Sequence, residues 1–285
     1  AMQTSTIDLD ATIPALNEAE QKRERRERQL TILAPLLVLV VALTAWELFV
    51  RINKIPPYIL PGPILVVQTL WNSWPSLATS LMFTAKLTLS ALALAVIGGV
   101  GLGTLFALSR IVEVSLFPYA VVLQVTPIIA VAPLILIYVD STMAALLICA
   151  WIVAFFPILS STVIGLRSAD HNLRDLFTLY EASAWQRFAL LLMPSALPYF
   201  MSGLKVAGGL ALIGAVVAEF VAGAAGKETG LASRIFEASF RSEIPLMFAA
   251  LLLVSMCGIV IFIVTSWISH KVLGHWHESE LKRER

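Results

Sequence analysis

Four polar or charged residues lie within or at the end of long apolar stretches, where their side chains could interact with a solute. Two of them, Gln124 and Thr126, directly precede Pro127. Lys205 lies close to several glycines, and Glu219 comes near the end of an apolar run. Ionisable groups are costly inside a bilayer and commonly face a water-filled cavity or a polar partner. We therefore treat these four residues as candidates for a solute path or gate.

Each of the four also has a purely structural interpretation. Lys205 would attract an anion in a path, or pair with a polar group such as Gln124. Gln124 and Thr126 would form hydrogen bonds with a solute. Alternatively, they lie at a helix kink, where Pro127 leaves a backbone carbonyl without its helical hydrogen bond. Glu219 would act at an outer gate or in binding a partner, or would be a solvated helix end. The sequence leaves both interpretations open for each residue.

Signatures of catalysis and of metal binding are missing from the sequence. Cys149 and Cys257 lie in apolar runs without a Cys-x-x-Cys spacing, and His275 and His277 are expected in a solvated tail. The pair Gly226-Lys227 lacks the upstream glycine and the following Ser or Thr of a nucleotide-binding P-loop. We therefore predict no catalytic, metal or cofactor site in this chain.

The composition indicates a membrane protein. The chain has 285 residues, of which 58% are hydrophobic and 14% charged, and its formal net charge is +1. The mean hydropathy is +0.84. Soluble domains carry roughly 25% charged residues, so a soluble enzyme and a disordered protein are both disfavoured. The near-neutral charge gives no reason to expect a nucleic-acid partner.

Six stretches are long and apolar enough to cross the bilayer as helices. About 20 such residues are needed to span the hydrocarbon core, which is roughly 30 Å thick. The runs are continuously apolar rather than alternating, which excludes a membrane β-barrel. We predict an all-α membrane protein with six transmembrane helices, at about residues 31–50, 78–108, 114–139, 142–166, 196–222 and 245–269. Gly98, Gly99, Gly101 and Gly103, in the second stretch, include the spacing of small residues that pack closely against another helix, and we expect them to serve packing.

Most Lys and Arg residues fall in the segments on the same side as the basic N-terminus, which predicts that both termini are cytoplasmic. We expect a disordered basic tail at 1–29, a transmembrane domain at 30–270 surrounded by lipid, and a polar tail at 271–285. The outer segment 223–243 is expected to hold a short amphipathic helix. The Pro-rich segment after the first helix is expected to be extended.

The cytoplasmic segment at about 168–194 is the longest loop and has helical periodicity. Its apolar residues recur every three or four positions, and Asn172 is placed to cap the first helical turn. One interpretation is a helix lying on the inner leaflet. The other is a docking element for a cytoplasmic partner.

This loop resembles the EAA loop of bacterial ABC importer permeases, whose pattern is E-A-A, three residues, Gly, nine residues, I-x-L-P. Asp175 matches the Glu, Glu181 the Gly, Leu191 the Ile, and Met193-Pro194 the Leu-Pro. The segments at 127–134 and 214–220 are also similar to the subgroup that imports nitrate, sulfonates, taurine, bicarbonate and thiamine-pyrimidine precursors. Ala169 to Asn172 looks closest to permeases for pyrimidine-precursor or riboflavin-like substrates.

The resemblance implies a type I ABC importer permease with six transmembrane helices in the bacterial inner membrane. It implies a homodimer, two cytoplasmic ATPase subunits that bind ATP and Mg²⁺, and a periplasmic binding protein that delivers a small polar or anionic solute. The loop would couple the permease to the ATPases through a coupling helix. The matching residues are Asp175, Tyr180, Glu181, Ala182, Ser183, Trp185, Arg187 and Pro194.

Glu181 departs from the pattern, because the family has a glycine in this bend. Either the bend has a negative φ and Glu181 forms an ion pair with the partner, or Glu181 is strained at a positive φ. We favour the first, since the carboxylate would stabilise the N-terminus of the helix that follows.

Two other classes of protein compete with this interpretation. A secondary transporter would work without ATP, but it is expected to show internal repeats and paired charges near the midplane, which we do not find. An intramembrane enzyme would need a motif such as HExxH or GxSxG, and neither occurs.

Overall fold

The computed structural model describes residues 9–227 and 230–274, and every regular element in this part of the chain is helical. The long helices are α1 (Leu9–Ile52), α3 (Trp74–Leu108), α6 (Thr142–Arg167), α9 (Met193–Ala224) and α11 (Ile244–Leu273). The shorter elements are α2 (Pro63–Asn72), α4 (Arg110–Val125), α5 (Ile128–Tyr138), α7 (His171–Leu179), α8 (Ala184–Arg187), the π-helical turn η1 (Phe188–Leu192) and α10 (Leu231–Phe240).

The chain divides into two units, one up to Leu65 and the other from Val66 on. In the first unit, α1 contains the apolar span Leu33–Ile52 and continues back to Leu9. The sequence predicts a disordered tail at 1–29; the structure describes residues 9–29 as the first part of this helix, and residues 1–8 lie outside the described residues. Glu, Gln, Lys and Arg dominate residues 18–29, and these residues are strong helix formers that extend an existing helix readily.

The segment between α1 and α2 is irregular, as its prolines predict. Glu47 holds it, because its carboxylate accepts hydrogen bonds from Arg51 Nε at 2.6 Å and from the Ile64 N–H at 3.2 Å. The Ile64 N–H belongs to the first turn of α2, where N–H groups have no partner within the helix.

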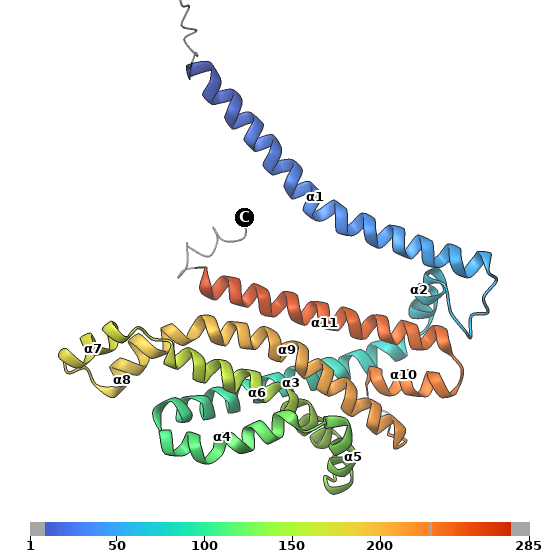
Figure 1. Cartoon of the computed structure of the whole chain (residues 1–285). Coiled ribbons are helices and arrows are strands. Elements are labelled where there is room, and N and C mark those ends of the chain that lie inside the picture. The colour runs from blue at the N-terminus through green and yellow to red at the C-terminus, as the bar shows by residue number, and fades with distance from the viewer. Residues whose placement is uncertain (1–8, 228–229, 275–285) are drawn as a thin grey trace, which may run out of the picture. The chain divides into compact units, whose positions relative to one another are not determined.

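In the second unit, α6 packs along both α3 and α9 (Figure 1). Small residues permit the close approach. A Cβ at Gly99 would lie 2.7 Å from Ile158 Cγ2, and one at Gly103 would lie 2.9 Å from Thr162. The predicted packing role of these two glycines is confirmed, and the contact is within the chain.

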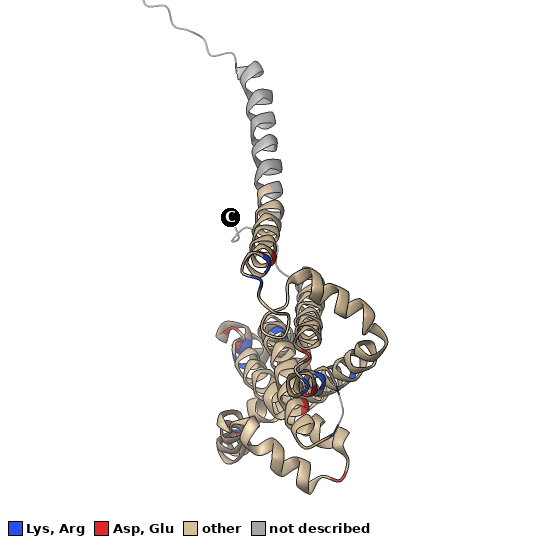
Figure 2. Ribbon diagram, turned by 90° about the vertical axis from the view of Figure 1, so that its right-hand side faces the viewer, with Lys and Arg blue, Asp and Glu red and all other residues tan. Residues whose placement is uncertain are grey.

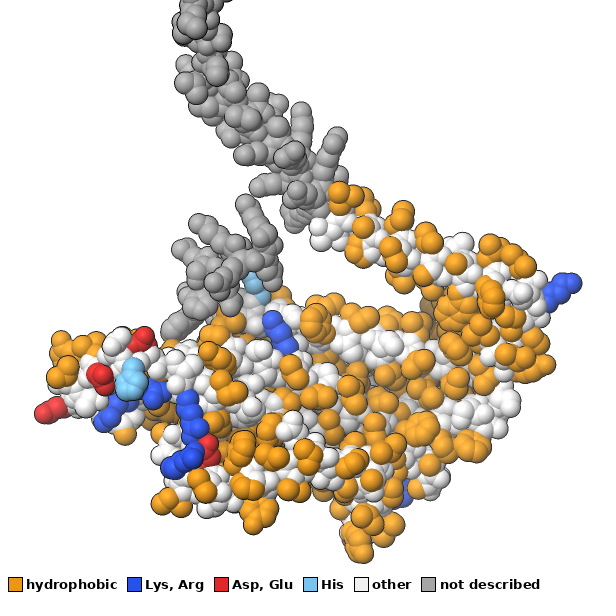
Figure 3. Space-filling view, in the orientation of Figure 1, with side chains coloured by type: hydrophobic (Ala, Val, Ile, Leu, Met, Phe, Trp, Pro, Cys, Tyr) orange, Lys and Arg blue, Asp and Glu red, His pale blue; other side chains and the backbone are white. Residues whose placement is uncertain are grey.

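The outside of the second unit is largely apolar, whereas its core is built from small side chains. Hydrophobic side chains cover much of the face in Figure 3, and charged side chains gather at the end that carries α7 and α8. An apolar surface of this kind is suited to lipid, which replaces water around a membrane helix. The fully buried alanines include Ala91, Ala145, Ala150, Ala211, Ala215 and Ala218.

The third predicted span, 114–139, is not one helix. It is broken into α4 and α5, which meet at an angle of 101°. Proline restricts the residue before it to extended backbone, and Thr126 indeed has φ −71° and ψ 123°. With the broken pair taken as one span, the described residues contain six candidate spans, and the other five predicted stretches are each found as a single long helix.

Candidate functional site

The loop at 168–194 begins with a capped helix, α7 (His171–Leu179). The Asp170 carboxylate accepts hydrogen bonds from the N–H groups of Asn172 at 2.7 Å and Leu173 at 3.4 Å, so Asp170 is the cap. The prediction that Asn172 caps this helix is wrong, because Asn172 is already its second residue. Asp170 accepts the bonds because it lies in extended backbone one residue ahead of the first turn.

Arginines connect α7 to the body of the protein. The Arg174 guanidinium donates to the carbonyls of Leu166 at 3.2 Å and Arg167 at 3.1 Å, which end α6 and have no helical donors of their own. Glu113 of α4 in turn forms ion pairs with Arg167 at 2.7 Å and with Arg110 at 2.8 Å. A movement of α7 would therefore be transmitted to the ends of α6 and α4. Figure 2 marks in blue and red where Lys, Arg, Asp and Glu occur along the described part of the ribbon.

The bend after α7 is a Schellman motif. The Glu181 N–H donates to the Thr178 carbonyl at 3.0 Å, and the Ala182 N–H donates to the Phe177 carbonyl at 2.9 Å. Glu181 occupies the left-handed position with φ 50°. The negative φ that we favour from the sequence is therefore wrong, because both crossed hydrogen bonds of this motif form only when its central residue is left-handed.

The helix α8 is short but well capped. The Ser183 hydroxyl accepts from the Gln186 N–H at 3.2 Å, and the Gln186 side chain accepts from the Ser183 N–H at 2.8 Å. This reciprocal pair is a capping box. The Arg187 guanidinium donates to the Ala182 carbonyl at 3.2 Å and fixes the bend from the other side.

The chain continues from α8 through η1 into α9 without an interruption. Pro194 is the second residue of α9, but the π-helical turn precedes it. It therefore does not begin a new helix, as the sequence suggests, and Ala184–Ala224 forms one candidate span. Since proline lacks an N–H, the wider π-helical turn just before it accommodates the missing hydrogen bond.

The surface of the loop carries large exposed side chains. Leu179, Tyr180 and Trp185 are 81%, 79% and 72% exposed, and Asp175 is exposed beside His171. Rigid aromatic side chains of this kind dominate the binding energy of protein interfaces. We refer to Leu179, Tyr180 and Trp185 as the exposed ridge.

At the opposite end of α9, Glu219 is fully buried. Its Oε2 accepts hydrogen bonds from Thr84 Oγ1 at 3.0 Å and from the Ala232 N–H at 3.1 Å, and Thr84 Oγ1 accepts from the Leu231 N–H at 2.9 Å. Side chains of α9 and α3 thus accept hydrogen bonds from the first N–H groups of α10, which have no partner within the helix. A Cβ at Gly230 would collide with both Glu219 and Thr84.

The interpretation of Glu219 as a solvated helix end is therefore wrong. The carboxylate reaches across to α10, the next helix in the chain, and accepts a hydrogen bond from its second residue, Ala232. No hydrogen-bond partner of Glu219 Oε1 is found in the described part of the chain.

The other three predicted path residues do not line one common cavity. Gln124 lines a cavity of about 260 Å³ between α4, α6 and α9, together with Ser160, Ser161 and Ser202. Thr126 closes the end of α4, because its hydroxyl donates to the Val122 carbonyl at 2.6 Å. Lys205 is half-buried on α9 and is not among the residues that line the cavity.

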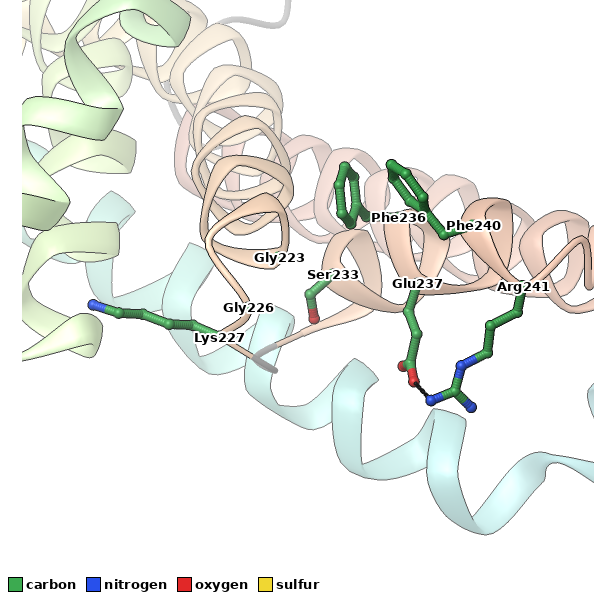
Figure 4. A pocket seen from close by; sticks show the side chains of 8 residues that line it. All are labelled: Gly223, Gly226, Lys227, Ser233, Phe236, Glu237, Phe240 and Arg241. Atoms are coloured by element: carbon green, nitrogen blue, oxygen red, sulfur yellow. Dashed lines mark ion pairs between the residues drawn. The ribbon is translucent and has the colours of Figure 1, made fainter.

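A second small cavity of about 260 Å³ lies at the junction of α9 and α10. Figure 4 shows Phe236 and Phe240 on one side of α10 and Glu237 and Arg241 on the other. Glu237 pairs with Arg241 at 2.7 Å and with Arg234 at 3.0 Å. The helix itself confirms the short amphipathic element predicted for 223–243.

Comparison with known proteins decides the family. Residues 99–274 match the model of the family described as "Binding-protein-dependent transport system inner membrane component". This chain belongs to that family. The match includes the loop, Gln124, Lys205 and Glu219, so that every candidate site residue lies inside the family region.

Relatives of this permease match it over most of their length. A "Probable ABC transporter permease protein" of Haemophilus influenzae is 30% identical over 249 residues, covering 86% of this chain and 98% of the relative. The "Formylaminopyrimidine transport permease protein ThiX" of Halalkalibacterium halodurans is 31% identical and covers 89% and 100%. The "Riboflavin transport system permease protein RibX" of Chloroflexus aurantiacus is 29% identical and covers 95% and 100%.

Solved structures share the fold of the permease. The methionine ABC transporter MetNI in inward-facing conformations gives a TM-score of 0.58 at 16% identity, covering 69% of this chain and 95% of the matched chain. An amino acid ABC transporter with histidines gives 0.59 at 14% identity, covering 72% and 97%. The predicted type I importer permease fold is confirmed.

Sequence reasoning missed several residues of the permease that the structure brings together. Thr84 and Glu113 each join two or three helices, and Ser160, Ser161 and Ser202 line a cavity. The Ser160-Ser161 pair within an apolar span is a signal that was available. Thr84 had no such signal, since a single threonine in a membrane helix commonly donates to its own backbone.

Proposed function

We propose that this permease is the membrane-spanning subunit of an ATP-driven importer, and that its loop at 168–194 couples it to a separate ATPase subunit. The exposed ridge carries this proposal. It lies on two short helices whose ends are fixed by the Asp170 cap, the Schellman motif and the capping box. Arg174 of α7 donates a hydrogen bond to the end of α6, and η1 connects α8 to α9. A movement of the docked ATPase would therefore move α7 and α8 together, and through them the ends of α6 and α9.

The proposed assembly has two permease chains and two ATPase subunits. ATP and Mg²⁺ would be bound by the ATPases, so this chain would act without a cofactor of its own. A periplasmic or lipid-anchored binding protein would deliver solute to the outer face. Both termini would be cytoplasmic in the inner membrane, with the loop on the same side.

The proposed solute is small and polar or anionic. Relatives of the permease carry names that refer to formylaminopyrimidine, riboflavin, aliphatic sulfonates and nitrate. These names span neutral and anionic solutes, so the family alone does not choose between them.

The test is ATP-dependent uptake by the assembled transporter. The permease is co-purified with a candidate ATPase and a candidate binding protein, and is reconstituted into vesicles. We expect solute uptake only when ATP is supplied, and none with a non-hydrolysable analogue. Uptake driven by a proton or sodium gradient without ATP would instead indicate a secondary transporter and overturn the proposal.

A further inference from the structure

A group of polar side chains lies on a membrane-spanning surface of the permease. Ser160 and Ser161 of α6, Ser202 of α9 and Gln124 of α4 line the 260 Å³ cavity, together with Phe156, Pro157, Gly203 and Val206. Ser160 and Ser161 lie six or seven residues from the Arg167 end of α6, which is about 10 Å along the helix at its 1.5 Å rise per residue. Ser202 lies nine residues into α9, about 14 Å from its start.

This depth is within the apolar part of the bilayer, where an unpaired hydroxyl or amide group facing lipid would cost several kcal/mol. Gln124 and Ser202 are nevertheless exposed in the chain, and Ser160 and Ser161 are partly exposed. Their exposure is explained if this face of α4, α6 and α9 lines a space that holds water and solute.

A larger cavity lies next to this one, on the side of the loop. Ser202 also lines this larger cavity of about 740 Å³, whose other walls include Ser168, Leu173 and Leu191 near the loop, and Leu273 of α11. A solute that leaves the small cavity past Ser202 therefore enters a space beside the loop. The route follows α9, which begins at the coupling segment.

The chemistry of the lining sets the class of solute. Hydroxyl groups and the Gln124 amide both donate and accept hydrogen bonds. Among the described residues, no Lys, Arg or His lines the cavity. An anion placed there would lose its hydration without gaining a paired charge, which is costly in a low-dielectric site. The lining therefore favours a solute without net charge.

The volume limits the size of the solute. Pockets for drug-sized ligands measure roughly 300–1,000 Å³, so 260 Å³ is at the small end. It is close to the volume of nine water molecules at about 30 Å³ each. A single-ring heterocycle fits this space, and Phe156 offers it an aromatic neighbour. A three-ring flavin with a sugar-alcohol chain does not fit.

We propose that the permease itself holds a binding point for an uncharged single-ring polar heterocycle, formed by Gln124, Ser160, Ser161 and Ser202. This inference rests on the proposed importer function and deepens it. It means that the permease, and not only the binding protein, selects among solutes.

The test uses cysteine labelling of the assembled transporter in vesicles. Ser160→Cys and Ser202→Cys are introduced one at a time into a Cys149→Ala, Cys257→Ala background. N-ethylmaleimide, a small uncharged reagent, attacks only thiols that water allows to ionise. We expect labelling about tenfold faster than at Ser255→Cys, an exposed serine on the apolar surface of α11.

Solutes are then tested as protecting agents. We expect formylaminopyrimidine to slow labelling at both positions, by about threefold or more when its concentration is well above its Kd. Nitrate and riboflavin are expected to leave the rate unchanged. Labelling as slow as at Ser255→Cys would show that the cavity is not water-filled. Absence of protection by formylaminopyrimidine, or equal protection by nitrate, would overturn the proposed class of solute.

The same vesicles separate this inference from the importer function. Association with the ATPase and ATP-dependent uptake of any solute are measured in parallel. If both persist while protection fails, the binding point is wrong and the importer function stands. If the ATPase does not associate, the proposed function itself fails.

Discussion

Glu181 occupies the left-handed backbone conformation that glycine adopts most easily, and the EAA pattern has a glycine at this position. A residue with a Cβ is strained there by roughly 1–2 kcal/mol. The structure requires the conformation, because both crossed hydrogen bonds of the Schellman motif depend on it. The ion pair that we expect between Glu181 and the ATPase stays a prediction.

Glu181→Gly should relieve this strain. We expect the folded loop to become more stable by up to about 1 kcal/mol, because the greater freedom of glycine in the unfolded loop offsets part of the relieved strain. Hydrogen exchange of the Ala182 amide would then slow by up to about fivefold. Glu181→Ala is the matched control, since it removes the charge and keeps the Cβ. Slower exchange in both variants would mean that the carboxylate, and not φ, destabilises the bend.

The buried hydroxyl of Thr84 provides a second prediction at this scale. Thr84→Val removes one donor to Glu219, which keeps the hydrogen bond from the Ala232 N–H, and it leaves the buried Leu231 N–H without its acceptor. We expect a loss of about 1–3 kcal/mol in stability, measured as a fall in the thermal unfolding midpoint of the purified permease.

Thr88→Val is the control for this variant. Thr88 is equally buried, but its hydroxyl donates only to the Thr84 carbonyl in its own helix. We expect its effect to be well below that of Thr84→Val. Equal effects would mean that α10 is held by packing and not by these hydrogen bonds.

Among the elements, the two short helices of the loop at 168–194 lie where the sequence predicts them. The periodicity of this loop and its spacing against the EAA pattern located both short helices. The predicted capping residue was wrong, because Asp and Asn are equally good capping types and the sequence does not choose between Asp170 and Asn172. The predicted sign of φ in the bend was also wrong. The sign of φ at Glu181 depends on hydrogen bonds across the bend rather than on residue type. The break between α4 and α5 was missed because hydropathy continues through Pro127 unchanged.

The exposed ridge should provide most of the affinity for the ATPase. Tyr180→Ala and Trp185→Ala should each weaken association by about 2 kcal/mol or more, roughly thirtyfold in Kd, since exposed aromatic anchors dominate interfaces. Association is measured by titrating the ATPase onto the permease in nanodiscs. Tyr138→Ala is the control, because Tyr138 is 82% exposed and ends α5. Unchanged affinity for all three would favour a helix lying on the leaflet.

We expect Arg174 to affect how movement passes from the loop to α6, and not how tightly the ATPase binds. Arg174→Ala removes both hydrogen bonds to the end of α6 but leaves the exposed ridge in place. We expect ATPase affinity to change less than about threefold, while the stimulation of ATP hydrolysis by the binding protein is largely lost. A loss of affinity equal to that of Trp185→Ala would show that Arg174 only folds the loop.

For the whole molecule, hydropathy predicted the all-helical fold and the number of spans, because length and apolarity alone decide what crosses a bilayer. Hydropathy could not predict the polar contacts between helices. Glu219 and Thr84 are 135 positions apart in the chain, and Arg167 and Glu113 are 54 apart. Which polar groups meet depends on how the helices rotate against one another, and small residues such as Gly99 and Gly103 set that rotation.

The orientation in the membrane is the last prediction. Helix α9 has 32 residues, or about 48 Å at its helical rise, and the hydrocarbon core is roughly 30 Å thick. Its two ends therefore emerge on opposite sides. Arg110, Arg167, Arg174 and Arg187 lie at the end that carries the loop, which places that end inside by the positive-inside rule.

In a background without Cys149 and Cys257, Lys227→Cys should react with a membrane-impermeant maleimide added to intact cells, because it lies beyond the far end of α9. Gln186→Cys, in α8, should react only after the cells are opened. The pair is matched, since the two residues lie at opposite ends of the continuous stretch Ala184–Ala224: Gln186 is its third residue, and Lys227 follows its last residue. The reverse pattern of labelling would invert the permease in the membrane. It would also place the exposed ridge in the periplasm, where no ATPase could reach it.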